Sequence, residues 1–360
     1  MFFPKDMIEL SIIVPVYNGS ESLVALINSI EFYNEGINDI IEILLIDNES
    51  TDNSLLCCEK LSKKYSNIRV YSYRHRGVGK TRNFGLTVAR GKYITFCDQD
   101  DEVTKGYNSF LQKIKMSNAE LLISNYTILH KGNICNSNKI TEERVCEHEV
   151  IREMTKRLFS IPTIIGESYY SHIPLFYPSI WNCIFLADTI KKNGIEISSF
   201  IEYDDDWKLL LEVLSVSNRV FLCTEPYYRW TYNSHSQSHS TKYIPEFTSL
   251  RKNLRDYSLR KMQSLSFMEE EIASVLATFD KETILKTFMN YKNCSYKHFI
   301  KRLKSIYIDF SLKNKTRMLS TSTNKEKIWL LLFYSQLHWL SWLYLKKNRK
   351  EYKSLFAKRV

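Results

Sequence analysis

The sequence predicts an α/β protein with a doubly wound, mostly parallel sheet and a helical C-terminal extension. Over the first 125 residues, short apolar runs typical of buried strands alternate with segments whose apolar residues recur at helical spacing. Beyond residue 240 the chain is basic, rich in aromatic residues and patterned mostly as helix. Strands that alternate with helices imply parallel crossovers, and therefore a sheet with helices on both faces.

The apolar runs give the order of the predicted elements. Residues 10–16 (LSIIVPV) are typical of a buried strand, and a helix with Leu23, Leu26, Ile27 and Ile30 on one face follows. A second strand covers residues 41–46 and ends at Asp47, after which a helix is expected to begin near Ser50 or Thr51. The remaining predictions are strands at 68–73, 92–97 and 121–123 and a helix at 78–89.

The formal net charge of +10 is unevenly distributed. Residues 241–360 hold 25 Lys and Arg against 10 Asp and Glu, whereas residues 1–240 hold 25 against 30. An acidic first part joined to a basic second part suggests two tasks. The basic part suits an anionic membrane surface, and nucleic acid is the poorer partner because no recognised binding motif accompanies the charge.

Cysteine usage and the first residues bear on the compartment. The eight cysteines include the neighbours Cys57 and Cys58 but no Cys-x-x-Cys pair, which argues against a zinc module or a disulfide framework and favours a reducing compartment. The start of the chain, MFFPKD, lacks the charged region and apolar run of a signal peptide. We therefore expect a cytoplasmic protein.

Three carboxylates end the predicted strand at 92–97. Asp98, Asp100 and Asp101 directly follow the apolar run YITFC. Charged groups at the carboxyl end of a buried strand need a partner, and open α/β sheets place their ligand crevice there. Crowded oxygen ligands suit Mg²⁺ or Mn²⁺, which in turn suit a phosphate-bearing substrate. Taken alone, the same residues also fit a polar turn that caps the next helix.

Four sequence blocks around this cluster resemble the family 2 glycosyltransferases with the GT-A fold. The blocks are SIIVPVYN at 11–18, LIDNESTD at 45–52, GVGKTRNFG at 77–85 and GKYITFCDQDD at 91–101. Their order and spacing match the family over about the first 105 residues. Weaker matches follow at WNCIF (181–185), YDDDW (203–207) and EPYYR (225–229).

The resemblance implies a nucleotide-binding segment. In the family, the residues matching Pro15, Val16 and Tyr17 and the aspartate matching Asp47 hold the nucleotide base, usually uracil. Asp47 also has a structural alternative, because Ser50, Thr51 and Asp52 after it are typical of a helix N-cap region. Since Asp47 precedes that region, it is the better functional candidate.

The resemblance also implies the metal site. The family's Asp-x-Asp, matching Asp98 and Asp100, holds the ribose and the metal, and the aspartate matching Asp101 often takes part. Mn²⁺ or Mg²⁺ is the expected cofactor, with Asp98, Asp100 and Asp101 as its ligands. Arg82 matches a basic position beside the nucleotide site, although a solvated helix arginine paired with an acid is the equal alternative.

The acids at 204–206 are the candidates for proton transfer. The family has a Glu-Asp pair here, at the start of a helix, and its aspartate deprotonates the acceptor hydroxyl. That aspartate matches Asp206, and Asp205 stands in the place of the glutamate. Crowded acids raise at least one pKa, which favours a base, whereas acids at a helix N-terminus are also stabilised by the helix dipole.

Two positions depart from the family pattern. Asn48-Glu49 stands where the family often has Asp-Gly, so the turn after Asp47 lacks the family's glycine. A family histidine that sometimes completes the metal site falls on Thr231. His235 and His239, four residues apart, are either substitutes for it or solvated loop histidines.

Residues 328–345 (IWLLLFYSQLHWLSWLYL) are apolar almost all round a helix and are followed by KKNRK. A spanning helix needs roughly 20 apolar residues, so this one is short. Its three tryptophans and basic flank fit a helix at the membrane interface, and a helix buried against the protein is the alternative.

Together with these patterns, the resemblance implies a metal-dependent, inverting glycosyltransferase. As the resemblance implies, it would move a sugar from a nucleotide donor, most simply UDP-linked, onto a glycan or a polyprenyl-diphosphate-linked acceptor. This places it in capsule, O-antigen or lipooligosaccharide assembly at the inner face of the cell membrane. We expect a catalytic domain at 1–240, with a nucleotide-sugar half at 1–125 and an acceptor half at 126–240, and a basic helical region at 241–360. The alternatives are a sugar nucleotidyltransferase, which needs a glycine-rich basic loop after the first strand, and a non-catalytic membrane-surface recruitment module.

Overall fold

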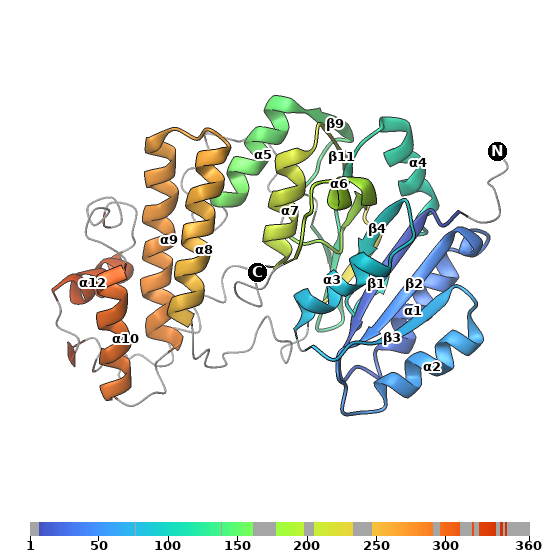
Figure 1. Ribbon diagram of the computed structural model, residues 1–360, viewed down its shortest axis with the longest axis horizontal. Helices are drawn as coiled ribbons and strands as arrows, with labels where there is room; N and C mark the ends of the chain where they lie inside the picture. The colour runs from blue at the N-terminus through green and yellow to red at the C-terminus, as the bar shows by residue number, and fades with distance from the viewer. Residues whose placement is uncertain are drawn as a thin grey trace. The chain divides into compact units, whose positions relative to one another are not determined.

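The computed structural model describes residues 7–75, 77–137, 139–160, 178–197, 205–232, 247–290, 296–309 and 324–335, with residues 319, 339, 340 and 343. The chain divides into two compact units (Figure 1). The first unit comprises Met1–Leu158 and Tyr170–Ser238, and the second comprises Phe159–Tyr169 and His239–Val360.

A sheet of eight strands forms the centre of the first unit, in the order β3-β2-β1-β4-β10-β6-β11-β9. The four strands β3, β2, β1 and β4 are parallel, β11 is parallel to β6, and β10 and β9 are antiparallel to their neighbours. This confirms the predicted α/β class. The strands are β1 (Leu10–Val16), β2 (Ile41–Asp47), β3 (Ile68–Ser72), β4 (Tyr93–Phe96), β6 (Leu121–Ser124), β9 (Arg144–Glu147), β10 (Cys183–Leu186) and β11 (Arg219–Cys223).

A smaller sheet lies in the same unit, in the order β5-β12-β7-β8. Its strands are β5 (Glu102–Val103), β7 (Thr127–His130), β8 (Asn133–Asn136) and β12 (Tyr228–Thr231). β5 follows directly after the three aspartates, so its pairing with β12 brings the end of the acidic turn against the residues near 228.

Helices cover both faces of the large sheet because the side chains of its strands alternate. Ile12 and Val14 of β1 belong to a buried cluster with apolar residues of α1 (Leu23–Tyr33), α2 (Ser54–Lys64) and α4 (Asn108–Ser117). Ile13 points to the other face, where α3 (Val78–Val88) packs so closely that a Cβ on Gly85 would lie 2.5 Å from the Ile13 side chain. The remaining helical segments of this unit are η1 (Asn38–Ile40), α5 (His148–Ser160), which runs past the boundary of the unit, α6 (Ala187–Lys192) and α7 (Asp205–Val216).

The helix after Asp47 begins later than predicted. α2 begins at Ser54 rather than near Ser50 or Thr51. The intervening residues form a turn, in which the Ser50 amide donates to Asp47 Oδ2 (3.3 Å) and the Ser54 amide donates to Asp52 Oδ1 (2.9 Å). Local side-chain acceptors thus compete with the first helical turn, as short polar residues commonly do.

The second unit is helical where it is described. α8 (Phe247–Ser264) and α9 (Glu269–Asn290) lie side by side and antiparallel (Figure 1). Arg255 forms a two-pronged ion pair with the buried Asp280, at 2.6 and 3.2 Å, and the Arg251 guanidinium lies 3.8 Å from the centre of the Phe279 ring. α10 (Tyr296–Asp309) and α12 (Asn324–Tyr334) are two further helices of this unit.

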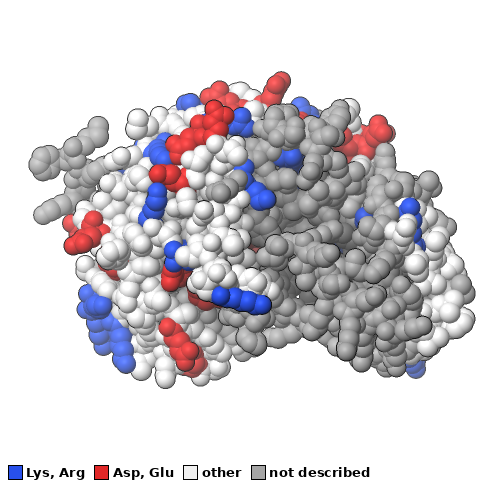
Figure 2. Space-filling view, turned by 180° about the vertical axis from the view of Figure 1, so that it is seen from behind, with Lys and Arg blue, Asp and Glu red and all other residues white. Residues whose placement is uncertain are grey.

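None of the described helices has both the length and the apolar character that a membrane span requires. On the face shown in Figure 2, the acidic and basic side chains that are described intermingle over the surface.

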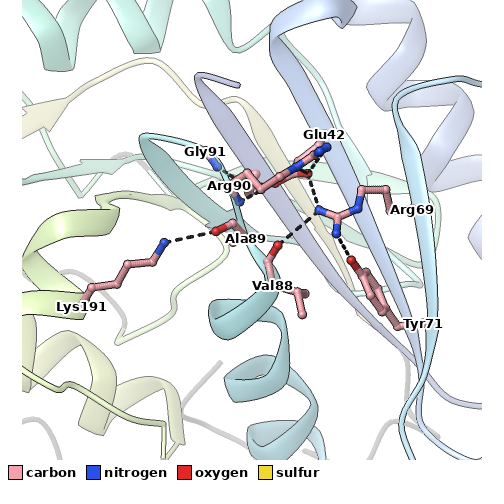
Figure 3. Close-up of polar contacts among 9 residues, drawn as sticks. Glu42, Arg69, Tyr71, Val88, Ala89, Arg90, Gly91 and Lys191 are labelled. Carbon is pink, nitrogen blue, oxygen red and sulfur yellow. Dashed lines mark hydrogen bonds and ion pairs between the residues drawn. The ribbon is translucent and has the colours of Figure 1, made fainter. Parts of the chain in front are cut away.

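Hydrogen bonds to one buried carboxylate connect the amino ends of the four strands β1, β2, β3 and β4. Glu42 of β2 is 1% exposed and accepts hydrogen bonds from Ser11 Oγ (2.6 Å), the Arg90 amide (2.7 Å) and the Arg69 guanidinium (2.9 Å) (Figure 3). Burial alone would raise the pKa of Glu42, but these hydrogen bonds outweigh it and hold the pKa below its ordinary value of 4.5. Ser11 Oγ in turn accepts from the Gly91 amide (2.8 Å), so four neighbouring chain segments meet at one ionised group.

Replacing Ser11 with alanine should lower the free energy of unfolding by about 1–2 kcal/mol, because a buried charged acceptor loses a donor. Because the folded pKa of Glu42 is depressed, its contribution is fully present above the unfolded pKa and is lost as pH falls through the folded pKa. The difference between wild type and Ser11→Ala should therefore be constant near neutral pH and shrink in acid. Urea denaturation over a pH series measures it. Ser62→Ala, which removes an exposed hydroxyl, is the matched control, and an equal effect of both variants would contradict the assignment.

Candidate functional site

The carboxyl ends of β1, β2 and β4 lie together at one edge of the sheet. Val16, the last residue of β1, pairs with Asp47, the last residue of β2, and β4 pairs with the other side of β1. The loops after these strands therefore meet at a single edge, where open α/β sheets bind their ligands. The predicted nucleotide segment (Pro15, Val16, Tyr17), Asp47 and the acidic turn all lie at this edge.

Asp47 combines burial with an available acceptor. Its side chain is 3% exposed, and Oδ2 accepts from the Ser50 amide at 3.3 Å. Oδ1 is also buried, and among the described residues no donor reaches it. A buried carboxylate oxygen without a donor is costly unless a ligand satisfies it. Asp47 is therefore suited to accept a hydrogen bond from a bound molecule such as a nucleotide base.

The turn after Asp47 accommodates Asn48 and Glu49, the two residues that depart from the family pattern. Glu49 adopts the left-handed region at φ +58°, a conformation that glycine accepts at lower cost. The Asn48 amide fits its surroundings when its nitrogen donates to the His75 carbonyl and its oxygen accepts from Gly77 N and Thr81 Oγ1. This turn is thus built without glycine and is anchored to the start of α3.

Arg82 connects two carboxylates that lie 108 residues apart in the chain. It extends from α3, and its Nη2 donates to Asp98 Oδ1 while its Nη1 donates to Asp206 Oδ1, both at 2.7 Å. Only 6% of the Arg82 side chain is exposed. Burial alone would lower the pKa of Arg82, but the carboxylates of Asp206, Asp98 and Asp205 outweigh it and raise the pKa, so the guanidinium stays charged. Arg82 is paired with acids, as one alternative held, but it is buried rather than solvated.

Asp206 lies in the first turn of α7, where a quarter of its side chain is exposed. Burial raises its pKa, Arg82 opposes this, and the negative charge of Asp98 adds to the rise, so that the net shift is upward. A carboxylate with a raised pKa is a stronger base than an ordinary aspartate once it is ionised. The geometry therefore gives Asp206 the two properties that a base needs, partial access and raised basicity.

Asp205 and Asp206 differ in exposure. Asp205 is 1% exposed, and its charge helps to raise the pKa of Arg82. Its predicted role in substrate binding stays a prediction. Asp204, His235 and His239 lie outside the described residues.

The three aspartates of the acidic turn differ in exposure. Asp98 and Asp100 are partly exposed, whereas Asp101 is 3% exposed. Asp101 Oδ2 accepts from the Tyr228 hydroxyl and Oδ1 from the Thr231 amide, each at 2.7 Å. These bonds tie the end of the turn to β12 and use the oxygens that a cation would need. The role of Asp101 as a metal ligand stays a prediction, and its visible role is to hold the turn.

Asp98 and Asp100 fit a divalent cation that binds together with its substrate. In the described part of the chain, no three histidine, cysteine or acidic side chains converge as a preformed metal site. Mg²⁺ and Mn²⁺ do not require one, because they are often held by one or two carboxylates with substrate phosphates and water. The donor set of Asp98 and Asp100 is compatible with that arrangement.

Two residues at the site were missed by sequence reasoning. Tyr228 is fully buried, accepts from the Asp98 amide (2.9 Å) and stacks on Trp181 with ring centres 4.8 Å apart. Gln99, the middle residue of the Asp-x-Asp, bonds both backbone groups of Tyr17. Both residues lie in blocks that match the family, Gln99 at 91–101 and Tyr228 at 225–229, and this was the available signal. Their partners lie 82 and 130 residues away and left no local signal.

Comparison with known proteins finds a family model that matches the segment forming most of this site. Residues 11–127 match the family model described as Glycosyl transferase family 2. Glycosyltransferase GlyG of Streptococcus pneumoniae serotype 4 is 33% identical over 119 residues, which cover 32% of this chain and 38% of GlyG. The minor teichoic acid biosynthesis protein GgaB of Bacillus subtilis is 37% identical over 99 residues, or 27% of this chain and 11% of GgaB. The matched stretches thus span well under half of these relatives.

A solved structure extends the likeness of the fold over nearly the whole chain. The crystal structure of S. aureus TarS 1–349 in complex with UDP-GlcNAc superposes with a TM-score of 0.65, covering 96% of this chain and 92% of that one. At 17% identity, this likeness shows the GT-A fold.

Replacing Tyr228 with phenylalanine should lower the free energy of unfolding by about 2 kcal/mol, because the Asp98 amide and the Asp101 carboxylate each lose a partner in the interior. Urea denaturation measures the loss. Tyr33→Phe is the control, since Tyr33 is 44% exposed. If the two variants were equally stable, Tyr228 would not hold the acidic turn.

Proposed function

We propose that this chain, a member of glycosyltransferase family 2 with the GT-A fold, transfers a sugar from a UDP-linked donor to a glycan or lipid-linked acceptor with inversion at the anomeric carbon. The acceptor belongs to bacterial surface polysaccharide synthesis, of the teichoic acid, capsule or O-antigen kind. The name of GgaB and the UDP-GlcNAc complex of TarS support this direction.

The observation that carries the proposal is the placement of Asp206 and Asp98 on one guanidinium. Asp98 lies on the acidic turn after β4, and Asp206 lies at the start of α7, yet Arg82 holds both at 2.7 Å. A donor diphosphate at Asp98 would therefore stand beside a partly exposed carboxylate of raised pKa. Direct displacement at the anomeric carbon requires this juxtaposition, because the base must reach the attacking hydroxyl while the leaving group departs on the other side.

Each residue then has a chemical task. Asp47 Oδ1 accepts a hydrogen bond from the nucleotide base, and the segment Pro15 to Tyr17 forms the wall beside it. Asp98 and Asp100 would hold Mn²⁺ or Mg²⁺, and the bound cation would supply positive charge that stabilises the departing diphosphate. Asp206 takes the proton from the acceptor hydroxyl and orients that oxygen for attack.

The two rival functions fit less well. A sugar nucleotidyltransferase needs a glycine-rich basic loop after the first strand, where this chain has Tyr17-Asn18-Gly19. A recruitment module without catalysis has no need for Asp98 and Asp206 to be held by one buried cation, or for a buried oxygen of Asp47 to lack a donor among the described residues.

Asp206→Asn should reduce sugar transfer by at least 100-fold while binding of UDP changes little, because the amide cannot accept the proton. The measurement is UDP release from a panel of UDP-sugars with a lipid-diphosphate acceptor, with Mn²⁺ and with EDTA. Asp188→Asn, at an exposed position of α6, is the matched control. Unchanged turnover in Asp206→Asn would remove it as the base, and full activity in EDTA would overturn the metal role of Asp98 and Asp100.

We propose further that the second unit binds the anionic inner surface of the cell membrane. One face of α12 is buried, with Leu330 and Phe333 fully covered, so the segment is partly packed on the protein. The opposite face exposes Ile328 (44%) and Leu331 (52%), and Trp339, further along the chain, is also exposed (50%). Exposed lysines on α10 and the excess of positive charge beyond residue 240 complement anionic lipid. Those lysines are Lys297, Lys301 and Lys304.

Leu331→Glu combined with Trp339→Glu should abolish binding to vesicles that contain phosphatidylglycerol, since two apolar contacts become repulsive charges. Vesicle flotation measures the bound fraction, and pure phosphatidylcholine vesicles should bind little wild-type protein. Met116→Glu is the control, because Met116 is 89% exposed on the first unit. Equal flotation of the double variant and the control would contradict the proposal.

A further inference from the structure

We infer that Gln99 is a positioning residue for the donor nucleotide, and that Gly19 is a glycine because it leaves room for the Gln99 side chain. The inference rests on the proposed function, and it assigns a task to the middle residue of the Asp-x-Asp, between the two aspartates that hold the diphosphate end.

The Gln99 side chain hydrogen-bonds to the backbone of Tyr17, in the loop after β1. Its Oε1 accepts from the Tyr17 amide at 2.9 Å, and its Nε2 donates to the Tyr17 carbonyl at 2.8 Å. One side chain thus satisfies both backbone polar groups of one residue. Two bonds at the end of one amide fix its position and its orientation, whereas a single bond would leave rotation free.

Gly19 forms the space that this amide occupies. A Cβ at Gly19 would lie 2.2 Å from Gln99 Cδ, 2.3 Å from Oε1 and 2.5 Å from Nε2. Gly19 does not adopt a positive φ, so its backbone conformation is open to other residues. Glycine is therefore required here because a larger residue would occupy the space that the Gln99 amide fills.

The same loop is held from the other side by the turn after β2. The Asn18 amide donates to Ser50 Oγ (3.1 Å), the Gly19 amide donates to Ser54 Oγ (2.8 Å), and Asn18 Oδ1 accepts from the Thr51 amide (2.8 Å). The loop Tyr17 to Gly19 therefore lies between the turn that carries Asp47 and the turn that carries Asp98 and Asp100. Gln99 supplies the connection on the side of the acidic turn.

This connection sets the spacing between the two ends of the donor site. Asp47 and the segment Pro15 to Tyr17 lie at the base end, and Asp98 and Asp100 lie at the diphosphate end. A nucleotide that spans both ends binds more tightly when their separation is fixed beforehand, because less conformational entropy is lost on binding. Gln99 therefore acts on donor affinity, and it does not touch the reacting atoms.

The experiment is a double-variant cycle read by UDP binding. Isothermal titration calorimetry with UDP and Mn²⁺ compares wild type, Gln99→Ala, Gly19→Ala and the double variant. Gln99→Ala should weaken binding about 10-fold. Gly19→Ala should weaken it to a similar extent because the new methyl group displaces the amide. The double variant should be no weaker than either single variant, since both break the same two hydrogen bonds.

Two further variants separate positioning from a loss of folding. Gln99→Glu keeps the acceptor for the Tyr17 amide but faces the Tyr17 carbonyl with a carboxylate, so it should bind UDP as weakly as Gln99→Ala. Gln112→Ala, on the exposed side of α4, is the matched control and should bind as wild type. In turnover, Gln99→Ala should raise the KM for the donor with kcat within about twofold, a split that general destabilisation would not give.

The outcomes distinguish the inference from the proposed function. If wild type binds UDP and Gln99→Ala binds it equally well, or if the two single effects add in full, the inference is overturned. If wild type binds no uridine nucleotide, the proposed donor itself is wrong. A fall in kcat with an unchanged KM would also overturn the positioning role.

Discussion

The site depends on two salt bridges made by one buried guanidinium: Arg82 binds both Asp98 and Asp206. A planar guanidinium offers parallel N–H donors on different nitrogens, so one side chain can hold two carboxylates at 2.7 Å at the same time. Lysine carries its charge at a single point and would not fix the two acids in this geometry. Because Asp98 follows β4 and Asp206 begins α7, this pair aligns the predicted nucleotide half with the predicted acceptor half.

The charge balance around Arg82 explains why the site suits cations. One guanidinium stands among Asp98, Asp205 and Asp206, and Asp100 and Asp101 are close along the chain. Two features of the site reduce the free-energy cost of gathering this excess negative charge. Burial and neighbouring carboxylates raise the pKa of Asp101 and of Asp206, although hydrogen bonds from Tyr228 and Thr231 partly oppose this for Asp101. The remaining negative charge lies on the partly exposed edge, where a divalent cation and its diphosphate would be bound.

The sequence contained enough information for the sheet and for the strand ends, because both follow from local patterns. Alternation of apolar runs and helical spacing predicted β1, β2, β3, β4 and β6 with errors of a residue or two, and carboxylates after apolar runs located Asp47 and Asp98. The start of α2 was misplaced because Asp47 and Asp52 take the amides of Ser50 and Ser54 into a turn. Long-range contacts explain what was missed, since Gln99, Tyr228 and the pairing of Arg82 with Asp206 depend on partners 82 to 130 residues away.

The two ends of the parallel strands have different roles: the amino ends stabilise the sheet, and the carboxyl ends carry the candidate site. At the amino ends, Glu42 is ionised and buried, and both of its carboxylate oxygens accept hydrogen bonds from the protein. This carboxylate is therefore not available to a ligand. At the carboxyl ends, Asp47 Oδ1 lacks a described donor, and Asp98 and Asp206 share a cation while staying partly exposed. A protein tolerates such incompletely satisfied groups only if the surrounding structure is held firmly elsewhere. The Glu42 network supplies that rigidity at the opposite end of the same strands, which is why β1, β2 and β4 can carry an open set of carboxylates at the edge where the substrate is expected.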